Sequence, residues 1–223
     1  AVGAMGALAK KNFSLGFRQL IAYNEEEAAQ VDADEEYLDQ FADLADHFLI
    51  GLSKVVEDEA GDRQVDMLMQ SVPNFERIGD YATNLVELAE RLQAEGTSFS
   101  DIEKKELGII CSAVNEILSI TVEAFTNDDN EKAKAIEPLE EVIDDLKEQM
   151  RTRHIMRLQQ GICSIETGFI WSDLLNSLER TSDHCSNIAG CVLETSKDEL
   201  DMHRYLASVR TESEEYRKLL AQY

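Results

Sequence analysis

Hydrophobic residues recur every three or four positions over most of the chain, which is the spacing of helices that bury one face. Between residues 75 and 92, for example, apolar side chains follow one another at alternating steps of three and four. The pattern predicts six long helices in two groups of three, and a further helix at the C-terminus. The expected helices are Met5–Tyr23, Glu25–Glu57, Asp62–Ala94, Asp101–Thr126, Asn130–Gln160, Ser164–Thr195 and Leu200–Tyr223.

The connections between these segments carry signals of helix boundaries. Residues 94–100 (A-E-G-T-S-F-S) form the clearest linker. Ser100 followed by Glu103 predicts a capping box, in which each side chain accepts a hydrogen bond from the other residue's backbone N–H. Shorter turns are expected at 59–62 and 127–130.

The two groups of helices carry the same motif, which indicates an internal duplication. Residues 76–84 and 179–187 both read E-R-x-x-D-x-x-x-N, at an offset of 103 positions. The preceding helices share an acidic residue, an aliphatic one and an aspartate at 35–39 and 140–144, at an offset of 105. The sequence therefore predicts an all-α fold of two tandem, pseudo-symmetric three-helix bundles. They are expected at 1–95 and 100–196, with a C-terminal helical extension at 197–223.

Acidic residues dominate the composition, because 45 Asp and Glu stand against 21 Lys and Arg and give a formal net charge of −24. Phosphate backbones and anionic lipid surfaces repel such a chain, so nucleic-acid binding and direct lipid binding are not expected. The 43% of hydrophobic residues is still enough for a folded core. Pro73 and Pro138 fall inside helical stretches and each predict a kink or a late helix start.

The chain is expected to be soluble. Its longest apolar stretch, 107–125, contains Asn115, Glu116 and Glu123 and is not expected to cross a membrane. No signal peptide opens the chain, and its first residues, without an initiator Met, resemble the edge of an excised piece. The four cysteines form no C-x-x-C pair, which favours reduced thiols in a cytosolic protein. They are Cys111, Cys163, Cys185 and Cys191.

The repeated acidic residues are candidate metal ligands. At about 100° per residue, Glu76 and Asp80 lie on the helix face opposite the apolar seam, and Glu179 and Asp183 repeat this arrangement. Acids at i and i+4 repel each other, and a hard cation between two neighbouring stripes would offset the repulsion. Oxygen ligands favour magnesium, calcium, manganese or iron over zinc. A solvated acidic face without metal remains the alternative, because such pairs are frequent by chance in so acidic a chain.

The E-R-x-x-D-x-x-x-N pair, with E-x-x-x-D on the preceding helix, resembles the PhoU domain over residues 8–195. The resemblance implies two similar three-helix bundles side by side, a role in regulating phosphate uptake, and iron or zinc clusters bound by surface E/D-x-x-x-D motifs. The implied ligands are Glu35, Asp39, Glu76 and Asp80 in one repeat and Glu140, Asp144, Glu179 and Asp183 in the other. Asn84 and Asn187 are the implied polar partners. The metal is expected to be iron, zinc or manganese, with magnesium and calcium as alternatives.

The second repeat resembles a narrower group, the cytoplasmic tails of bacterial Na/Pi cotransporters. The shared residues are His154, Arg157, Gly161, Cys163, Glu166, Gly168 and Phe169, then the stretches 172–175 and 183–189, and His203, Tyr205 and Leu206. Residues 57–63 depart from the corresponding stretch of stand-alone PhoU proteins. This resemblance implies the soluble tail of a sodium-dependent phosphate transporter on the cytoplasmic side of the inner membrane. Its partners would be the transmembrane transport domain of the same polypeptide and a second copy in a homo-dimer.

Two alternatives to the transporter tail stay open: a stand-alone PhoU-type signalling adaptor and a metal-free helical docking module. An enzyme is not expected. Ferritin-like di-iron proteins use Glu-x-x-His pairs, and none of the four histidines follows a Glu at that spacing. The chain also lacks a P-loop, a glycine-rich nucleotide motif and a nucleophile elbow.

Three further expectations concern single residues. His184 is expected to pack or to face solvent rather than to bind metal, because it lies about 100° around the helix from Asp183. Trp171 and Phe169 are expected in the core. The only basic stretch, around His154 and Arg157, is expected to meet an acidic stripe of the neighbouring bundle or a phosphate.

Overall fold

The computed structural model describes residues 1–195 and 214–223 of the chain, and all regular elements in these ranges are α-helices. The first three are α1 (Val2–Ile21), α2 (Glu25–Leu52) and α3 (Glu59–Ala94). After the linker come α4 (Asp101–Asn127), α5 (Asn130–Lys134), α6 (Ile136–Gln159) and α7 (Ile165–Thr195). The last is α9 (Glu214–Gln222). The predicted all-α fold is confirmed.

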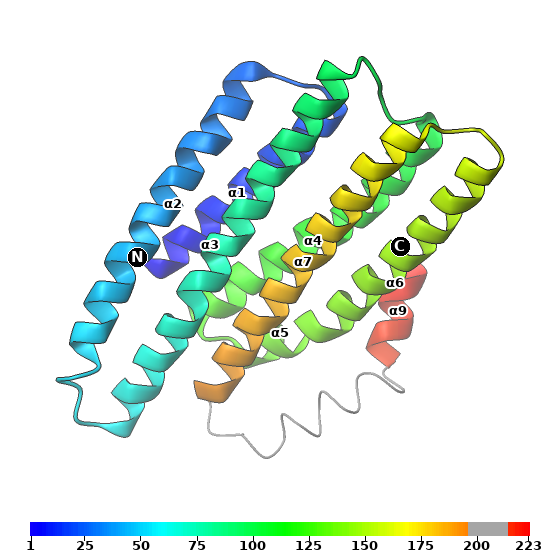
Figure 1. The fold of residues 1–223 in the computed structure, drawn as a ribbon. Coiled ribbons are helices and arrows are strands. Elements are labelled where there is room, and N and C mark those ends of the chain that lie inside the picture. The colour runs from blue at the N-terminus through cyan, green and yellow to red at the C-terminus, as the bar shows by residue number, and fades with distance from the viewer. Residues whose placement is uncertain (196–213) are drawn as a thin grey trace.

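The helices form two three-helix units that lie side by side (Figure 1). In the first unit α1 packs on α3 and α2, and in the second α4 packs on α6 and α7, with the short α5 at one end. Contacts between α3 and α7, and between α1 and α4, join the two units. The third helix of each repeat, which carries the repeated motif, therefore lies at the junction of the two units.

Most predicted helix boundaries agree with the structure. The Ser100 capping box is present, because Ser100 accepts from the Glu103 backbone N–H and Glu103 accepts from that of Ser100. Pro138 is the third residue of α6, where its missing N–H costs no helical hydrogen bond, so the late start predicted there is confirmed. α3 runs as one helix through Pro73.

The turn predicted at 59–62 is wrong. α2 ends at Leu52, and the connection to α3 lies at 53–58. Asp58 is the N-cap of α3, and its carboxylate accepts a hydrogen bond of 2.8 Å from the Gly61 backbone N–H. This cap starts the helix before Gly61, the residue on which the turn was predicted.

Large apolar side chains fill the interior of each unit. Phe13, Phe75 and Trp171 are fully buried. Among the described helices α4 alone is long and apolar enough to cross a membrane by length and composition, and half of that stretch is buried inside the fold. Buried core helices of soluble proteins share these properties, so they are weak evidence for a membrane span.

The C-terminal helix α9 packs on α6. The Tyr216 hydroxyl donates to Asp145 of α6, and the Tyr223 hydroxyl donates to Glu116 of α4. The helix predicted over 200–223 is thus present over 214–222. The predicted part before residue 214, with His203, Tyr205 and Leu206, lies outside the described residues.

Gly16 of α1 allows the close approach of α1 to α3, and Gly16→Ala is expected to lower stability. An added Cβ would lie 2.6 Å from the Ala82 carbonyl oxygen, a backbone atom that cannot rotate away. Overpacking of this kind costs about 1–3 kcal/mol, more than the roughly 1 kcal/mol that Ala gains over Gly in a helix. Urea unfolding of the variant measures this loss.

Gly108→Ala in α4 is the matched control, because no atom lies within 4 Å of its added Cβ. It is expected to raise the free energy of unfolding by up to about 1 kcal/mol. Equal effects of the two substitutions would contradict the close-packing explanation for Gly16.

Candidate functional site

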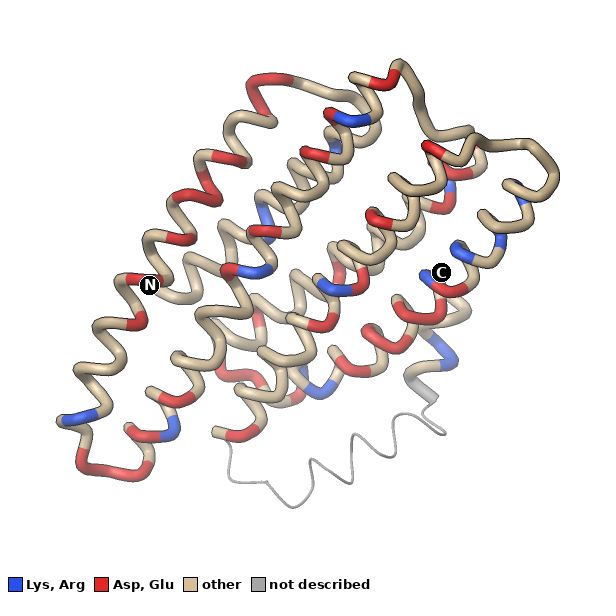
Figure 2. The backbone as a smooth tube through the Cα atoms, in the orientation of Figure 1, with Lys and Arg blue, Asp and Glu red and all other residues tan. Residues whose placement is uncertain are grey.

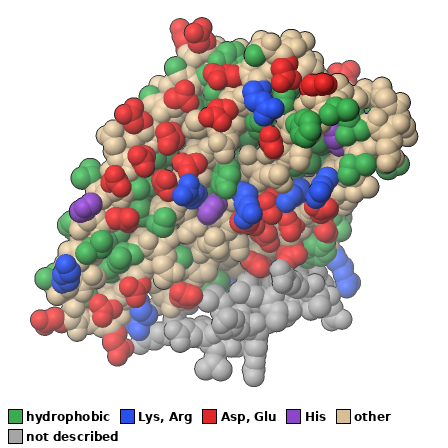
Figure 3. Space-filling view, in the orientation of Figure 1, with side chains coloured by type: hydrophobic (Ala, Val, Ile, Leu, Met, Phe, Trp, Pro, Cys, Tyr) green, Lys and Arg blue, Asp and Glu red, His purple; other side chains and the backbone are tan. Residues whose placement is uncertain are grey.

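The four acids predicted as ligands in the first repeat lie together between α2 and α3, and we call them the first acidic cluster. Burial raises the pKa of Glu35, and the charges of Asp80 and Asp39 raise it further. Burial and the charge of Asp80 likewise raise the pKa of Glu76, to which Asp39 adds. The carboxylates of α2 and α3 are therefore close enough to repel one another. Figure 2 shows acidic residues along both helices, and acidic side chains are exposed over the same region of the surface in Figure 3.

A surface hollow of about 400 Å³ opens beside this cluster. Its lining residues are Glu35, Arg77, Asp80, Tyr81, Thr83 and Asn84. Asn84, the predicted polar partner, is thus brought next to two predicted ligands. Arg77 donates to Asp80 at 2.8 Å, so this carboxylate is already oriented by a cation on its own helix.

The second acidic cluster comprises Glu140, Asp144, Glu179 and Asp183, between α6 and α7. Burial, followed by the charges of Glu137 and Asp144, raises the pKa of Glu140 to about 8. The pKa of Asp144 is raised by burial and by the charge of Glu179. The eight residues that the repeat predicted are therefore brought together as two groups of four, at equivalent places in the two units.

The two clusters differ in the Lys and Arg side chains that contact their carboxylates. Arg180 contacts Asp183 at 3.5 Å, as Arg77 contacts Asp80 in the first cluster. In the second cluster Lys147 also pairs with Glu179 at 3.2 Å, and the side chain of Lys147 is only 15% exposed. At the offset of 105, the equivalent of Lys147 is Ala42, which has no charge. The second cluster is therefore partly neutralised by the chain itself.

Asn187, the counterpart of Asn84, contacts the first unit. Its amide donates to Asn74 of α3 at 3.3 Å, across the junction of the two units. The His184 ring also contacts Asn74, at 2.8 Å, and lies against the Tyr81 ring. Both side chains thus contact α3 from α7, which agrees with the packing expected for His184.

Sequence reasoning missed two acids beside the second cluster. Glu137, Glu140 and Glu141 offer carboxylate oxygens that all lie within 4.8 Å of one another. Their spacing of three and four residues on one helix was the available signal. Glu137 also accepts a hydrogen bond from Ser186 of α7 at 2.6 Å, which orients it toward that helix. Together the clusters offer many oxygen donors, the ligand type that suits hard cations.

A buried polar group in the second unit was also missed, and it corrects the prediction for the basic stretch. Arg157 donates two hydrogen bonds to Glu106, at 2.8 and 3.2 Å, and His154 contacts Glu103 at 3.1 Å. All four residues are buried. The acids come from α4 of the same unit and not from the neighbouring bundle. The available signal was the matching spacing of three residues on the two helices.

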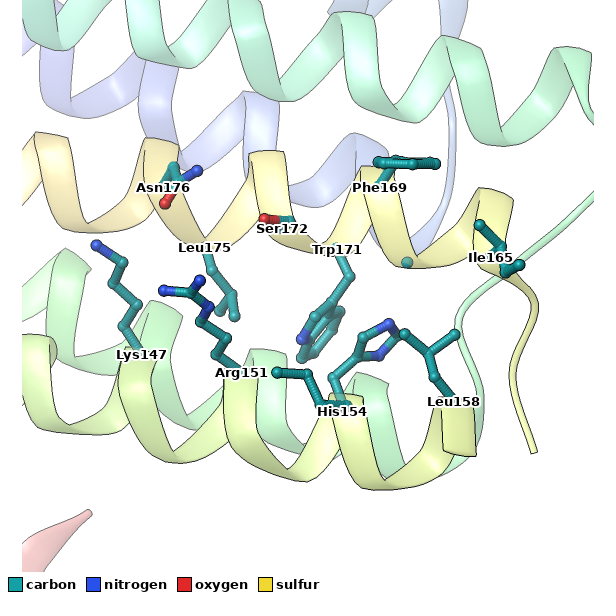
Figure 4. Close-up of a pocket in the computed structure, with 12 residues that line it drawn as sticks. Lys147, Arg151, His154, Leu158, Ile165, Phe169, Trp171, Ser172, Leu175 and Asn176 are labelled. Carbon is teal, nitrogen blue, oxygen red and sulfur yellow. The ribbon is translucent and has the colours of Figure 1, made fainter. Parts of the chain in front are cut away.

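An apolar pocket of about 260 Å³ lies next to this group, between α6 and α7 (Figure 4). His154 and Trp171 lie against each other at one side, and Lys147 and Arg151 line the other end. The expected burial of Trp171 is confirmed, since it is 1% exposed, whereas that of Phe169 is wrong, since it is 64% exposed. Phe169 lines the pocket and is exposed because α7 turns this position away from the seam.

The raised pKa of Glu140 predicts how the free energy of unfolding changes with pH. A carboxyl whose pKa is higher in the folded state stabilises the fold below its unfolded pKa and loses this contribution as pH rises to about 8. We expect the free energy of unfolding of the metal-free wild type to fall over this pH range, and that of Glu140→Gln to fall less. The rise of the pKa from 4.5 to about 8 sets an upper limit of roughly 5 kcal/mol, and screening reduces this to about 2 kcal/mol.

Urea unfolding with chelator at pH 5.5 and 8.5 measures the difference. Glu57→Gln, in the connection between α2 and α3, is the control and should follow the wild type. A parallel decline of wild type and Glu140→Gln would contradict the assignment of the effect to Glu140.

The match to a known protein family has two segments, as the internal duplication does. The family model described as the PhoU domain matches residues 2–89 and 108–192, one segment in each unit. The phosphate-specific transport system accessory protein PhoU homolog 1 of Thermotoga maritima is 27% identical over 154 residues, 68% of this chain and 64% of that protein. The phosphate-specific transport system accessory protein PhoU homolog of Pseudomonas aeruginosa is 28% identical over 195 residues. This alignment covers 85% of this chain and 78% of that protein.

Solved structures show the same fold. The crystal structure of PhoU from Pseudomonas aeruginosa aligns with a TM-score of 0.80 and 24% identity, over 86% of this chain and 91% of that one. That of the phosphate transport system regulatory protein PhoU from Streptococcus pneumoniae aligns with a TM-score of 0.79 and 20% identity, over 89% and 92%. The arrangement of two three-helix units is therefore shared with these proteins.

Proposed function

Because the chain belongs to the PhoU domain family, we propose that it is a non-enzymatic regulator of phosphate uptake that binds metal ions through its two acidic clusters. The observation that carries the proposal is the duplication of a four-carboxylate group at equivalent places in two units. Such groups repel themselves without a cation, and repetition in both units argues against chance.

The relatives' names support a role beside a transport system. Two of them are phosphate-specific transport system accessory proteins. These names favour the PhoU-type accessory regulator over the tail of a sodium-coupled cotransporter, which stays a prediction from the motif in the second repeat. In the proposed role the chain acts at the cytoplasmic side of a membrane and its partner is a membrane phosphate transporter.

Several features of the site suit regulation better than catalysis. The acidic clusters lie on helix faces near the junction of the units and contain carboxylates together with their own cations, Arg77 and Arg180. Iron, manganese or zinc held there would cross-link α2 to α3 and α6 to α7. Metal occupancy would then bias how the two units present their surface to a transporter.

Phosphate uptake in cells of the source organism tests the proposal. Cells without the chain are expected to lose the adjustment of uptake to external phosphate, and the wild-type gene should restore it. Asp80→Asn with Asp183→Asn should fail to restore it, whereas Asp128→Asn, in the turn after α4, should succeed. Unchanged uptake and regulation in cells without the chain would overturn the proposal. Full restoration by the double variant would overturn the metal-dependent part alone.

A further inference from the structure

Three side chains of different chemical types converge in the second unit. Glu103 at the start of α4, His154 of α6 and Cys163 in the α6–α7 connection offer ligand atoms that all lie within 4.8 Å of one another. Glu103 is 1% and His154 is 4% exposed, and Cys163 is half-buried. His154 and Cys163 belong to the sequence stretch 154–169, which the acidic clusters do not involve.

The geometry is not that of a catalytic relay. In a Cys–His–acid relay, the thiol and the carboxylate contact opposite nitrogens of the imidazole. Here both contact the same nitrogen, because His154 Nδ1 lies 3.1 Å from Glu103 Oε1 and 4.0 Å from Cys163 Sγ. Burial and the charge of Glu103 also raise the pKa of the Cys163 thiol, the opposite of activation. Three donors around one point are the arrangement of ligands that share an ion.

We propose that Glu103, His154 and Cys163 form a Zn²⁺ site, with water in the fourth position. Thiolate, imidazole and carboxylate together are a typical zinc ligand set. Zinc bond lengths of about 2.0–2.3 Å place tetrahedral ligand atoms about 3.4–3.6 Å apart. The separations of 3.1 and 4.0 Å lie on either side of these values, and the carboxylate and thiol atoms lie within 4.8 Å of each other, so a movement of Cys163 toward the other two ligands closes the site. Cys163 lies in a connection between helices, where such a shift is easily made.

Charge balance supports this ion. The Glu103 carboxylate and the Cys163 thiolate, whose proton leaves to solvent on binding, together neutralise Zn²⁺. Arg157 Nε lies 4.0 Å from the first oxygen of Glu103, but its guanidinium is paired with Glu106 through two hydrogen bonds, so the Arg157–Glu106 pair adds no net charge to the site.

Neighbouring groups hold two of the ligands in place. The second oxygen of Glu103 accepts from the backbone N–H and the hydroxyl of Ser100, both at 2.8 Å, which leaves the first oxygen for the ion. The Trp171 ring stacks on the His154 ring at 5.9 Å and fixes its orientation (Figure 4). Supporting contacts of this kind are characteristic of metal sites.

Cobalt binding to the reduced, chelator-treated full chain tests the proposal. Co²⁺ is expected to produce a thiolate-to-cobalt charge-transfer band at one equivalent, and Zn²⁺ should displace it. The acidic clusters contain only oxygen ligands and cannot give this band, so the result is independent of the proposed function. A folded, reduced wild type without the band would overturn the zinc site.

Variants assign the band to these residues. Cys163→Ser should abolish it, and Cys191→Ser, at a buried cysteine of α7 outside the site, should keep it. Glu103→Gln retains a residue that can form the capping box and should weaken zinc binding at least about tenfold. A band that persists in Cys163→Ser, or zinc affinity unchanged in Glu103→Gln, would contradict the assignment.

Discussion

Protein purified without chelator is expected to carry several equivalents of iron, manganese or zinc, and Asp80→Asn with Asp183→Asn is expected to lose the metal of both acidic clusters. Each substitution replaces a charged oxygen ligand by a neutral one of the same shape and leaves one carboxylate fewer in its group of four. Loss of an outer-sphere partner alone costs about 10–100-fold in metal affinity, so loss of a direct ligand should cost at least as much. Plasma mass spectrometry measures the metal content.

The single variants should differ, because Lys147 already neutralises part of the second cluster. Asp80→Asn should therefore remove more metal than Asp183→Asn, since the first cluster has Ala42 where the second has Lys147. Asp128→Asn is the control for an Asp→Asn change outside both clusters and should leave the metal content unchanged.

Chelation gives an independent measurement of the same sites. A metal present at 100 times its dissociation constant stabilises the fold by about 2.7 kcal/mol, so EDTA should lower the melting temperature of the wild type. The Asp80/Asp183 double variant should show a smaller decrease with EDTA than the wild type, since only metal bound outside the acidic clusters is left to remove. A double variant with full metal content, or a wild type that binds none of these metals, would show that the clusters are solvated faces without a metal role.

The sequence predicted the acidic clusters because their residues are set by periodicity and repetition. Glu76 and Asp80 lie opposite an apolar seam that the spacing of hydrophobic residues defines, and the repeat supplies Glu179 and Asp183. The pairing of α2 with α3, and of α6 with α7, then follows from the packing of three helices in each unit. Asn187 makes a contact that the repeat does not predict, because its partner Asn74 corresponds to Ser177 at the offset of 103.

The buried group around Arg157 could not be predicted in the same way. Glu103 and Glu106 occupy positions of the buried face of α4, one turn before Leu107 and Ile110, where an unpaired acid would be costly. Their burial depends on His154 and Arg157, which are 51 positions away in the chain and arrive only when α6 packs on α4. The matching spacing of three residues on the two helices does not say that α4 and α6 meet at these positions, and the energetics of the pair depend on removal from water rather than on sequence spacing.

Glu106→Leu is expected to destabilise the fold strongly, because it leaves the Arg157 guanidinium buried without its bidentate partner. Breaking a buried ion pair from one side typically costs about 3–5 kcal/mol. Glu103 cannot replace the lost partner, since its nearest oxygen is 4.0 Å from Arg157 Nε and is already in contact with His154. Arg157→Met should cost less, because Glu106 keeps Arg153 at 3.5 Å. Urea unfolding in the presence of chelator measures the free energies of unfolding of the two single variants and of the variant that combines them.

The double variant Glu106→Leu with Arg157→Met decides whether charge or packing holds α4 to α6. Both replacements keep most of the side-chain volume, and together they remove both charges of the pair, so neither partner remains buried without the other. The free energy of unfolding should then return to within about 1 kcal/mol of the wild type, since apolar replacements of buried ion pairs are often neutral or stabilising. A double variant as unstable as the two single losses added together would mean that the pair is not coupled, and that the shape of these side chains rather than their charge determines stability here.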